Sequence, residues 1–222
     1  NNKKRGGAIK KSVYSQVLKD DVLSSIDRMA YEQGVSRSAL VNRVLAEYAS
    51  LFTPEHRIRS LFDAVCEMLE PQSVLQLASS EGVLTLRSSL QYKYNPVMRY
   101  TVEINREAGE KLGVLRACLR TQNAALIACL QSFYQLWIAL ETASNPSLAQ
   151  ESSVSGTKYT RVLSSPKQPV DGQEIAECIA GYVGLFDGCM KCFFANMPQM
   201  AYAAQQTEQY YWNHLTKEVA QL

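Results

Sequence analysis

The chain has 222 residues, of which 46% are hydrophobic and 20% charged, a composition typical of a soluble globular protein with one large domain or two modest ones. The net charge is +2, but residues 1–50 carry nine Lys and Arg against five Asp and Glu, whereas the other residues carry fourteen against sixteen. A basic N-terminal segment followed by a slightly acidic remainder is typical of a chain whose N-terminal part contacts a polyanion.

Uninterrupted apolar runs in this sequence are shorter than the roughly 18–20 residues that a membrane-spanning helix requires. The best candidate, residues 175–195, is interrupted by Glu177, Asp187 and Lys191. We therefore expect a soluble protein without membrane contact, located in the cytoplasm, or in the nucleus if the source is eukaryotic.

Residues 1–9 are basic, contain glycine and show no hydrophobic periodicity, so we expect a flexible arm there. Its charge comes from Lys3, Lys4 and Arg5, followed by Lys10. Such an arm is either a solvated tail or a segment that contacts nucleic-acid phosphates.

A strand, a helix, a glycine turn and a second helix follow in order. Near alternation of β-prone residues predicts a strand over 12–18. Apolar residues at helical spacing predict an amphipathic helix over 21–33, which Gly34 ends as a left-handed C-cap. Ser36 then begins a second helix as its N-cap, and this helix extends to about Leu51.

These elements occupy residues 10–53, up to the Thr53-Pro54 boundary, and they cannot enclose a hydrophobic core. The single strand has two bare edges and no other strand to pair with. A second copy of the chain has to complete the unit, most simply by pairing the two strands across a two-fold axis. The sequence therefore predicts an obligate homodimer.

The same elements resemble the ribbon-helix-helix family of DNA-binding proteins, of the Arc and MetJ type. The resemblance covers residues 10–51 and rests on a lone strand, a helix and a Gly-x-Ser-Arg-Ser sequence that opens a second helix. The matching positions are Leu18, Val22, Ile26 and Ala30, followed by Gly34, Val35, Ser36, Arg37, Ser38, Ala39, Leu40 and Val41.

The resemblance implies that the strands of two protomers pair antiparallel and enter the major groove of double-stranded DNA. The base-contacting positions on the outward face of the strand would be Lys11, Val13, Ser15 and Val17. The start of the second helix would bind a phosphate at Ser36, Arg37 and Ser38.

The outward face of the strand is more apolar than the family usually shows. Val13 and Val17 offer a thymine methyl an apolar contact but no hydrogen bond, and a β-bulge would present Tyr14 and Gln16 instead. Two alternatives stay open: the second-helix start is a plain N-cap with a solvated arginine, or the whole unit serves only to dimerise.

Residues 55–222 form a second predicted domain, mostly helical with a small antiparallel β-meander, so the expected fold class is α+β. Helices are predicted over 55–70, 110–144, 173–196 and 198–222, and three strands over 73–105. The segment 145–171 is expected to be a long loop with a short β-like piece at 158–163. The helix at 173–196 carries small residues at every fourth position, which lets a neighbouring helix approach closely: Ala176, Ala180, Gly184 and Gly188.

One cluster of aromatic and basic residues surrounds the second predicted hairpin of this domain: Tyr92, Lys93, Tyr94, Arg99 and Tyr100. Such a mixture either stacks on bases or binds a ligand, or it consists of cross-strand aromatic pairs with solvated cations.

Residues for catalysis or metal binding are sparse. The six cysteines lie mostly in apolar helical patterns, which favours small buried thiols over a disulfide framework. Cys189 and Cys192 have metal-like or redox-like spacing, but they lie in a predicted helix with no second pair and no nearby histidine. With His56 and His214 as the two histidines, we expect no enzyme activity, no metal and no cofactor.

The sequence as a whole predicts a dimeric, sequence-specific DNA-binding protein, a prokaryotic, plasmid or phage transcriptional regulator or repressor associated with the nucleoid. Residues 55–222 would bind a small-molecule effector or a protein partner, or extend the oligomer. The alternatives are a DNA-processing accessory protein of a relaxosome or partition system, and a scaffold that uses the first unit only to dimerise.

Overall fold

The computed structural model describes residues 17–51, 54–72, 74–80, 82–106, 109–146, 151–165 and 171–216. Internal contacts divide the chain into two compact units, Asn1–Leu51 and Phe52–Leu222. The division falls beside the Thr53-Pro54 pair.

The first unit contains helix α1 (Asp20–Glu32) and helix α2 (Arg37–Leu51), which agree with the two predicted helices. Gly34 between them has a φ of +62°, the left-handed conformation expected of it. The N–H of Gly34 donates to the carbonyl of Tyr31 at 3.1 Å, and the N–H of Val35 donates to that of Ala30 at 3.0 Å. These two bonds are a Schellman motif, which ends α1 and reverses the chain.

The predicted strand before α1 lies largely outside the described residues, because the description begins at Val17. Residues 17–19 have no regular secondary structure. The described part of this unit is thus a helix, a glycine turn and a helix, and its strand remains a prediction.

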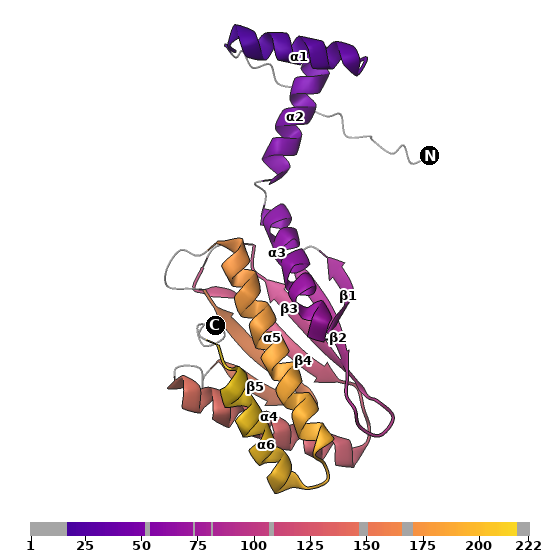
Figure 1. Ribbon diagram of the computed structural model, residues 1–222, viewed down its shortest axis with the longest axis vertical. Coiled ribbons are helices and arrows are strands. Elements are labelled where there is room, and N and C mark those ends of the chain that lie inside the picture. The colour runs from indigo at the N-terminus through magenta and orange to yellow at the C-terminus, as the bar shows by residue number, and fades with distance from the viewer. Residues whose placement is uncertain are drawn as a thin grey trace, which may run out of the picture. The chain divides into compact units, whose positions relative to one another are not determined.

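The second unit is built on a six-stranded antiparallel sheet with the strand order β1-β2-β3-β4-β6-β5 (Figure 1). Its strands are β1 (Leu75–Ser80), β2 (Val83–Ser89), β3 (Val97–Ile104), β4 (Lys111–Leu119), β5 (Ser152–Ser155) and β6 (Lys158–Ser164). The pairing register shifts between Gln76 and Ala78, so the edge strand β1 carries an irregularity typical of a β-bulge.

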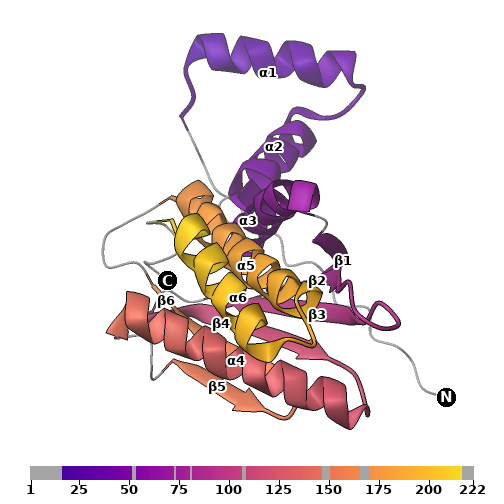
Figure 2. The same ribbon diagram turned by 60° about the horizontal axis from the view of Figure 1, so that its bottom comes forward.

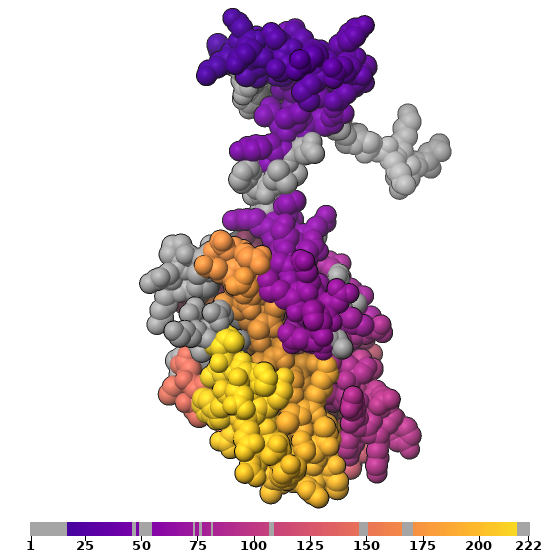
Figure 3. All heavy atoms as spheres, in the orientation of Figure 1, coloured from indigo at the N-terminus to yellow at the C-terminus, as the bar shows by residue number. Residues whose placement is uncertain are grey.

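Helices cover one face of this sheet: α3 (Pro54–Leu69), α4 (Ala124–Ser144), α5 (Gly172–Ala195) and α6 (Met200–His214). Figure 2 shows α5 and α6 running over the strands, and Figure 3 shows α3, α5 and α6 as adjacent bands. Strand residues alternate between a buried and an exposed face, as period-two patterning requires. The buried face consists of Leu84, Leu86, Ser88, Met98, Tyr100, Val102, Ile104, Leu115, Ala117, Leu119, Tyr159, Arg161 and Leu163.

The predicted long helix over 110–144 is wrong in its first third. Lys111–Leu119 is strand β4, residues 120–123 lie between the elements, and α4 begins at Ala124. The leucines here fit a helical spacing, but Gly113 and Ala117 complete a strict alternation that a count of large apolar residues overlooks. The Asn123 side chain accepts a bond from the N–H of Leu126 at 3.1 Å, which fixes the true start of the helix.

The prediction of a small three-stranded β-meander also underestimates the size of the sheet. Its three strands are present as β1, β2 and β3, and the β-like piece in the predicted loop is β6. With β4 and β5 added, the meander is one half of a larger sheet, so the second unit is a two-layer α+β domain. Strand β5 has only four residues, three of them serine, so its one β-prone residue, Val154, is too weak a signal to predict a strand.

The row of small residues on α5 has the packing purpose that we expected. A Cβ on Gly184 would overlap the side chain of Gln72, in the short 3₁₀ turn Glu70–Gln72 that follows α3. A Cβ on Gly188 would overlap the ring of Tyr210 on α6. Glycine at these two positions therefore allows Gln72 and Tyr210 to pack directly against the backbone of α5.

Helices α4 and α5 are long and apolar enough to span a membrane by length and composition. Core helices of globular domains pass the same test, and 72% of the relevant stretch of α5 is buried within the second unit. This finding concerns the described residues alone.

Gly113→Ala should weaken the sheet, because a Cβ there would overlap the backbone carbonyl of Glu103 on β3. We expect the free energy of unfolding to fall by about 3 kcal/mol, measured by urea denaturation. Gly172→Ala is the control, since no described atom lies within 4 Å of its added Cβ, and its effect should stay within about 0.5 kcal/mol. Equal effects of the two variants would contradict the strand assignment.

Candidate functional site

The corner between α1 and α2 holds the residues that the sequence assigned to phosphate binding. Ser36 caps α2, since its Oγ accepts a bond from the N–H of Ala39 at 3.2 Å. Arg37 and Ser38 follow as the first exposed residues of the helix. The free N–H groups of a helix start and its dipole both favour an anion here.

The Arg37 guanidinium forms two hydrogen bonds with the carboxylate of Asp27 on α1. A third hydrogen bond joins the helices where Arg43 on α2 donates to the side chain of Gln33, which caps the end of α1. The first pair is about half exposed, so it remains open to exchange with another anion. Arg37 is therefore a brace of the corner in the free chain, which the sequence did not anticipate.

Apolar side chains of the first unit remain largely exposed in the single chain. Among the hydrophobic residues of this unit whose side chains the structure describes, only Ala30 and Leu40 are buried, at 6% and 2% exposure. By contrast Val22 and Met29 on α1 are about two fifths exposed, while Val44 and Leu45 on α2 are nearly half exposed. Two helices alone thus leave most of their apolar stripes uncovered.

The remaining predicted DNA-contacting residues are mostly beyond the described part of the chain. Lys11, Val13 and Ser15 of the strand lie outside it, as do Lys3, Lys4, Arg5 and Lys10 of the basic arm. Val17 is described and fully exposed, whereas the exposed fraction of its neighbour Leu18 is 36%. Because residues 17–19 have no regular secondary structure, the assignment of strand faces stays a prediction.

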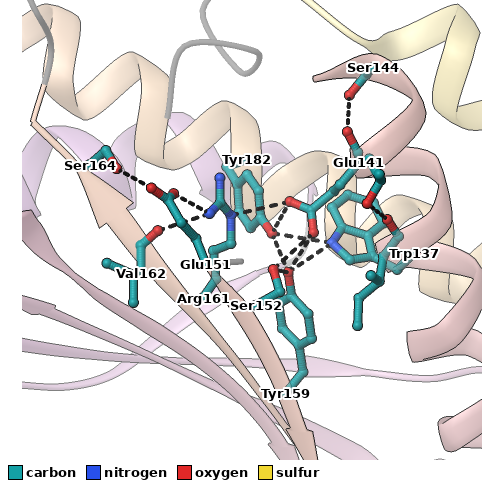
Figure 4. Close-up of polar contacts among 12 residues, drawn as sticks. Trp137, Glu141, Ser144, Glu151, Ser152, Tyr159, Arg161, Val162, Ser164 and Tyr182 are labelled. Carbon is teal, nitrogen blue, oxygen red and sulfur yellow. Dashed lines mark hydrogen bonds and ion pairs between the residues drawn. The ribbon is translucent and has the colours of Figure 1, made fainter. Parts of the chain in front are cut away.

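The second unit contains a polar network in its core, centred on Arg161 of β6 (Figure 4). Arg161 is completely buried, and its Nη1 lies 2.6 Å from the carboxylate of Glu151. Its Nε lies 3.3 Å from the carboxylate of Glu141 on α4. A buried charge costs several kcal/mol unless it is paired, and here two carboxylates balance one guanidinium.

Hydroxyl groups complete the coordination of Glu141. Tyr182 on α5 donates to its Oε1 at 2.8 Å, and Tyr159 on β6 donates to its Oε2 at 2.6 Å. The Trp137 indole N–H on α4 lies 3.2 Å from both tyrosine oxygens. Burial and the Glu141 carboxylate raise the pKa of Tyr159, so this hydroxyl stays protonated as a donor. The network thus locks α4, α5 and β6 together.

Asp187 on α5 is a second buried carboxylate. Ser88 donates to it at 3.0 Å, Tyr100 donates at 2.7 Å, and the Lys191 ammonium lies 2.7 Å away. Burial, and then the Asp187 charge, raises the pKa of Tyr100 well above its usual value. Tyr100 is therefore a structural anchor, not a member of an exposed aromatic cluster.

A groove of about 500 Å³ lies beside this carboxylate. Its lining combines backbone at the two α5 glycines with polar side chains: Gln72, Gly184, Gly188, Lys191, Tyr210 and His214. The Lys191 charge is already matched by Asp187, so the groove offers hydrogen bonds more than net charge.

The Cys189 and Cys192 pair has little reactivity to offer. All six cysteines are free thiols. Burial raises the pKa of Cys189, and the neighbouring Cys192 adds to the shift, which disfavours the thiolate that metals and disulfides require. No group of three metal-ligating side chains occurs within the described ranges.

The sequence analysis missed the network residues, although two patterns point to them. Arg161 alternates with Tyr159 and Leu163, which puts it on the buried side of β6. Glu141 lies one helical turn after Trp137, in the buried stripe of α4. A charge in a buried register implies a partner, which a search for catalytic motifs does not seek.

Comparison with protein-family models, with curated proteins and with solved structures found no match to this chain. The ribbon-helix-helix resemblance therefore depends on its own residues and on the geometry of the α1–α2 corner.

Glu141→Ala should destabilise the second unit by about 3 kcal/mol, because it removes one of the two carboxylates that balance the buried Arg161. Urea denaturation measures the change. The exposed Glu177→Ala on α5 is the control and should cost less than about 0.5 kcal/mol. Replacing Glu141 and Arg161 together by Met should recover most of the loss, and a still larger loss in the double variant would contradict the charge-balance argument.

Proposed function

We propose that this chain is a dimeric, sequence-specific DNA-binding protein of the ribbon-helix-helix type, acting as a transcriptional regulator or repressor. The observation that carries the proposal is the α1–α2 corner. There, a left-handed Gly34 and the Ser36 cap present a helix start to solvent, beside apolar stripes that one chain leaves uncovered.

The uncovered stripes support the dimer. Val22, Met29, Val44 and Leu45 belong to both helices of a unit with two buried hydrophobic residues among those described. Burying each such side chain contributes about 1.5–3 kcal/mol, which is a large fraction of the stability of a unit this small. A second copy offers the same stripes in return, as a two-fold interface requires.

The helix start supports the contact with DNA. Backbone N–H groups at Arg37 and Ser38 lie outside the hydrogen-bond ladder of the helix, and the dipole adds positive potential there. A phosphate bound here must compete with Asp27 for the Arg37 guanidinium. Two such clamps in a dimer would set the register of the paired strands in the major groove.

The second unit would act as the effector or partner domain, and its polar groove beside Lys191 and Tyr210 is the candidate place for a small effector. A role in a relaxosome or partition complex is the second candidate function. It shares the DNA contact and differs only in whether the bound site is an origin or a promoter. The proposal places the protein on the nucleoid and assigns it no catalytic step.

Arg37→Ala and Asp27→Ala should change DNA affinity in opposite directions. Arg37→Ala removes a phosphate ligand. It should weaken binding about tenfold to a DNA duplex that the unsubstituted protein selects from genomic DNA. Asp27→Ala removes the competing carboxylate and should strengthen binding a few-fold. Fluorescence anisotropy with duplex DNA at fixed salt measures both.

The exposed Arg57→Ala, in the second unit, is the matched control and should leave duplex affinity unchanged. If Arg37→Ala and Asp27→Ala behave alike, Arg37 serves only as a brace, and the phosphate-binding assignment fails.

Val44→Glu combined with Leu45→Glu should dissolve the dimer, because both side chains would carry charge into the proposed interface. Light scattering during size-exclusion chromatography should show monomer at micromolar concentration, with the dissociation constant raised by about 100-fold or more. Leu75→Glu, a similarly exposed apolar position in the second unit, should leave the dimer intact. A monomeric unsubstituted chain would refute the dimer outright.

A further inference from the structure

The sheet of the second unit has one face that no described helix covers. On the side opposite α3 to α6, the central strands present Thr85, Thr101 and Thr160 together with arginine and lysine side chains. The proposed function does not use this open face, which carries most of the charge of the sheet.

Three cations form one row across the open face. Arg87 of β2 pairs in register with Arg99 of β3, Arg99 pairs with Cys118 of β4, and Cys118 pairs with Lys158 of β6. All three cationic residues are exposed. With strands spaced about 4.8 Å apart, this basic row spans roughly 14 Å.

The same end of the sheet carries further positive charge. Lys93 lies in the turn between β2 and β3, and Arg120 directly follows β4. No acidic residue occurs in residues 87–99 or 116–123, and Glu103, farther along β3, is matched by Arg116 at 2.7 Å. The local charge is therefore strongly positive on a unit whose sequence is slightly acidic.

Folding alone does not account for the basic row. Like charges directly opposite on neighbouring strands destabilise a sheet, and Arg87 and Arg99 are such a pair. Within the described part of the chain, neither these two side chains nor Lys158 forms an ion pair. A polyanion lying across the row would turn this repulsion into attraction.

Tyr94 provides an aromatic surface at the same end. It is 98% exposed and has a φ of +67°, which is unusual for a tyrosine. The other two tyrosines of the predicted aromatic and basic cluster contact the helices instead. Tyr92 packs against Phe194, and Tyr100 donates a hydrogen bond to Asp187. This exposed ring lies in the turn between β2 and β3, at the end of the sheet where these two strands carry Arg87 and Arg99, and is free for stacking.

We propose that the open face is a binding surface for single-stranded nucleic acid, with Arg87, Arg99 and Lys158 on its phosphates and Tyr94 stacked on a base. A duplex keeps its bases inside, so it would present only phosphate to an exposed ring, whereas an unpaired strand offers both backbone and base. Guanidinium planes add stacking of their own. This surface is separate from the helix start in the first unit and goes beyond the function proposed above.

The test compares two triple variants of the full-length chain. The first variant carries Arg87→Ala, Arg99→Ala and Lys158→Ala together. It should bind a labelled oligothymidylate about tenfold more weakly than the unsubstituted chain. The slope of log affinity against log salt should fall in magnitude by about 2, since each phosphate contact contributes about 0.7. The second variant, the control, carries Arg57→Ala, Arg59→Ala and Lys111→Ala, which remove three other exposed cations of the same unit. It should change neither the affinity for the oligothymidylate nor the salt slope.

Tyr94 gives an independent readout. Tyr94→Ala should weaken oligothymidylate binding about tenfold with an unchanged salt slope, while Tyr94→Trp should retain it, because stacking needs only an aromatic face. Duplex DNA binding should be unaffected by all of these variants, so the Arg37 experiment can fail or succeed separately.

Three outcomes would overturn the proposal. These are equal losses in the two triple variants, an equal loss of duplex binding in the basic-row variant, and displacement of the oligonucleotide by polyglutamate at equal charge concentration. The last result would assign the face to an acidic protein partner.

Discussion

A single buried charge constrains the second unit more than any other feature. Arg161 has no exposed surface, so its guanidinium has to be balanced by groups that folding brings to it. Glu141 lies on α4, and Glu151 is the residue just before β5. Tyr182 on α5 donates a hydrogen bond to Glu141 and holds that carboxylate in place. The layer of helices cannot shift along the sheet without leaving one of these groups unpaired. A purely apolar core of leucines would tolerate such a shift, since hydrophobic contact is not directional.

The first unit has the opposite character. It has little core to hold it, and its order comes from local chemistry: a Schellman turn at Gly34, a cap at Ser36 and three side-chain hydrogen bonds between the helices. These interactions fix the angle of a corner but leave its apolar stripes open. The two units therefore divide the work of the chain. One has an extensive core of its own, and the other leaves apolar side chains of both its helices exposed.

Local capping chemistry was readable from the sequence, whereas long-range pairing was not. Gly34 and Ser36 act through neighbours a few residues away, so their roles were correctly predicted from type and spacing. Strand β4 was mistaken for helix because Leu112, Leu115 and Leu119 recur at helical spacing, although in the strand Leu112 lies on the opposite face from the other two. Pairing with β3 and β6 establishes the strand. The two carboxylate partners of Arg161 lie 10 and 20 residues away along the chain and meet it only in the folded state. Arg37 was correctly placed at the helix start, but its pairing with Asp27 depends on the angle between two helices, which no spacing rule supplies.

The edges of the sheet have a consequence for self-association. An open sheet exposes unpaired backbone at its two outer strands, and such strands invite other chains to add to them. Here one outer strand, β1, is irregular between Gln76 and Ala78, and the other, β5, is only four residues long. Neither offers a long, straight template, so the domain resists growth into a continuous sheet between molecules. If the proposed dimer forms at the α1–α2 corner, copies of the chain could gather on a nucleic acid without their sheets joining edge to edge.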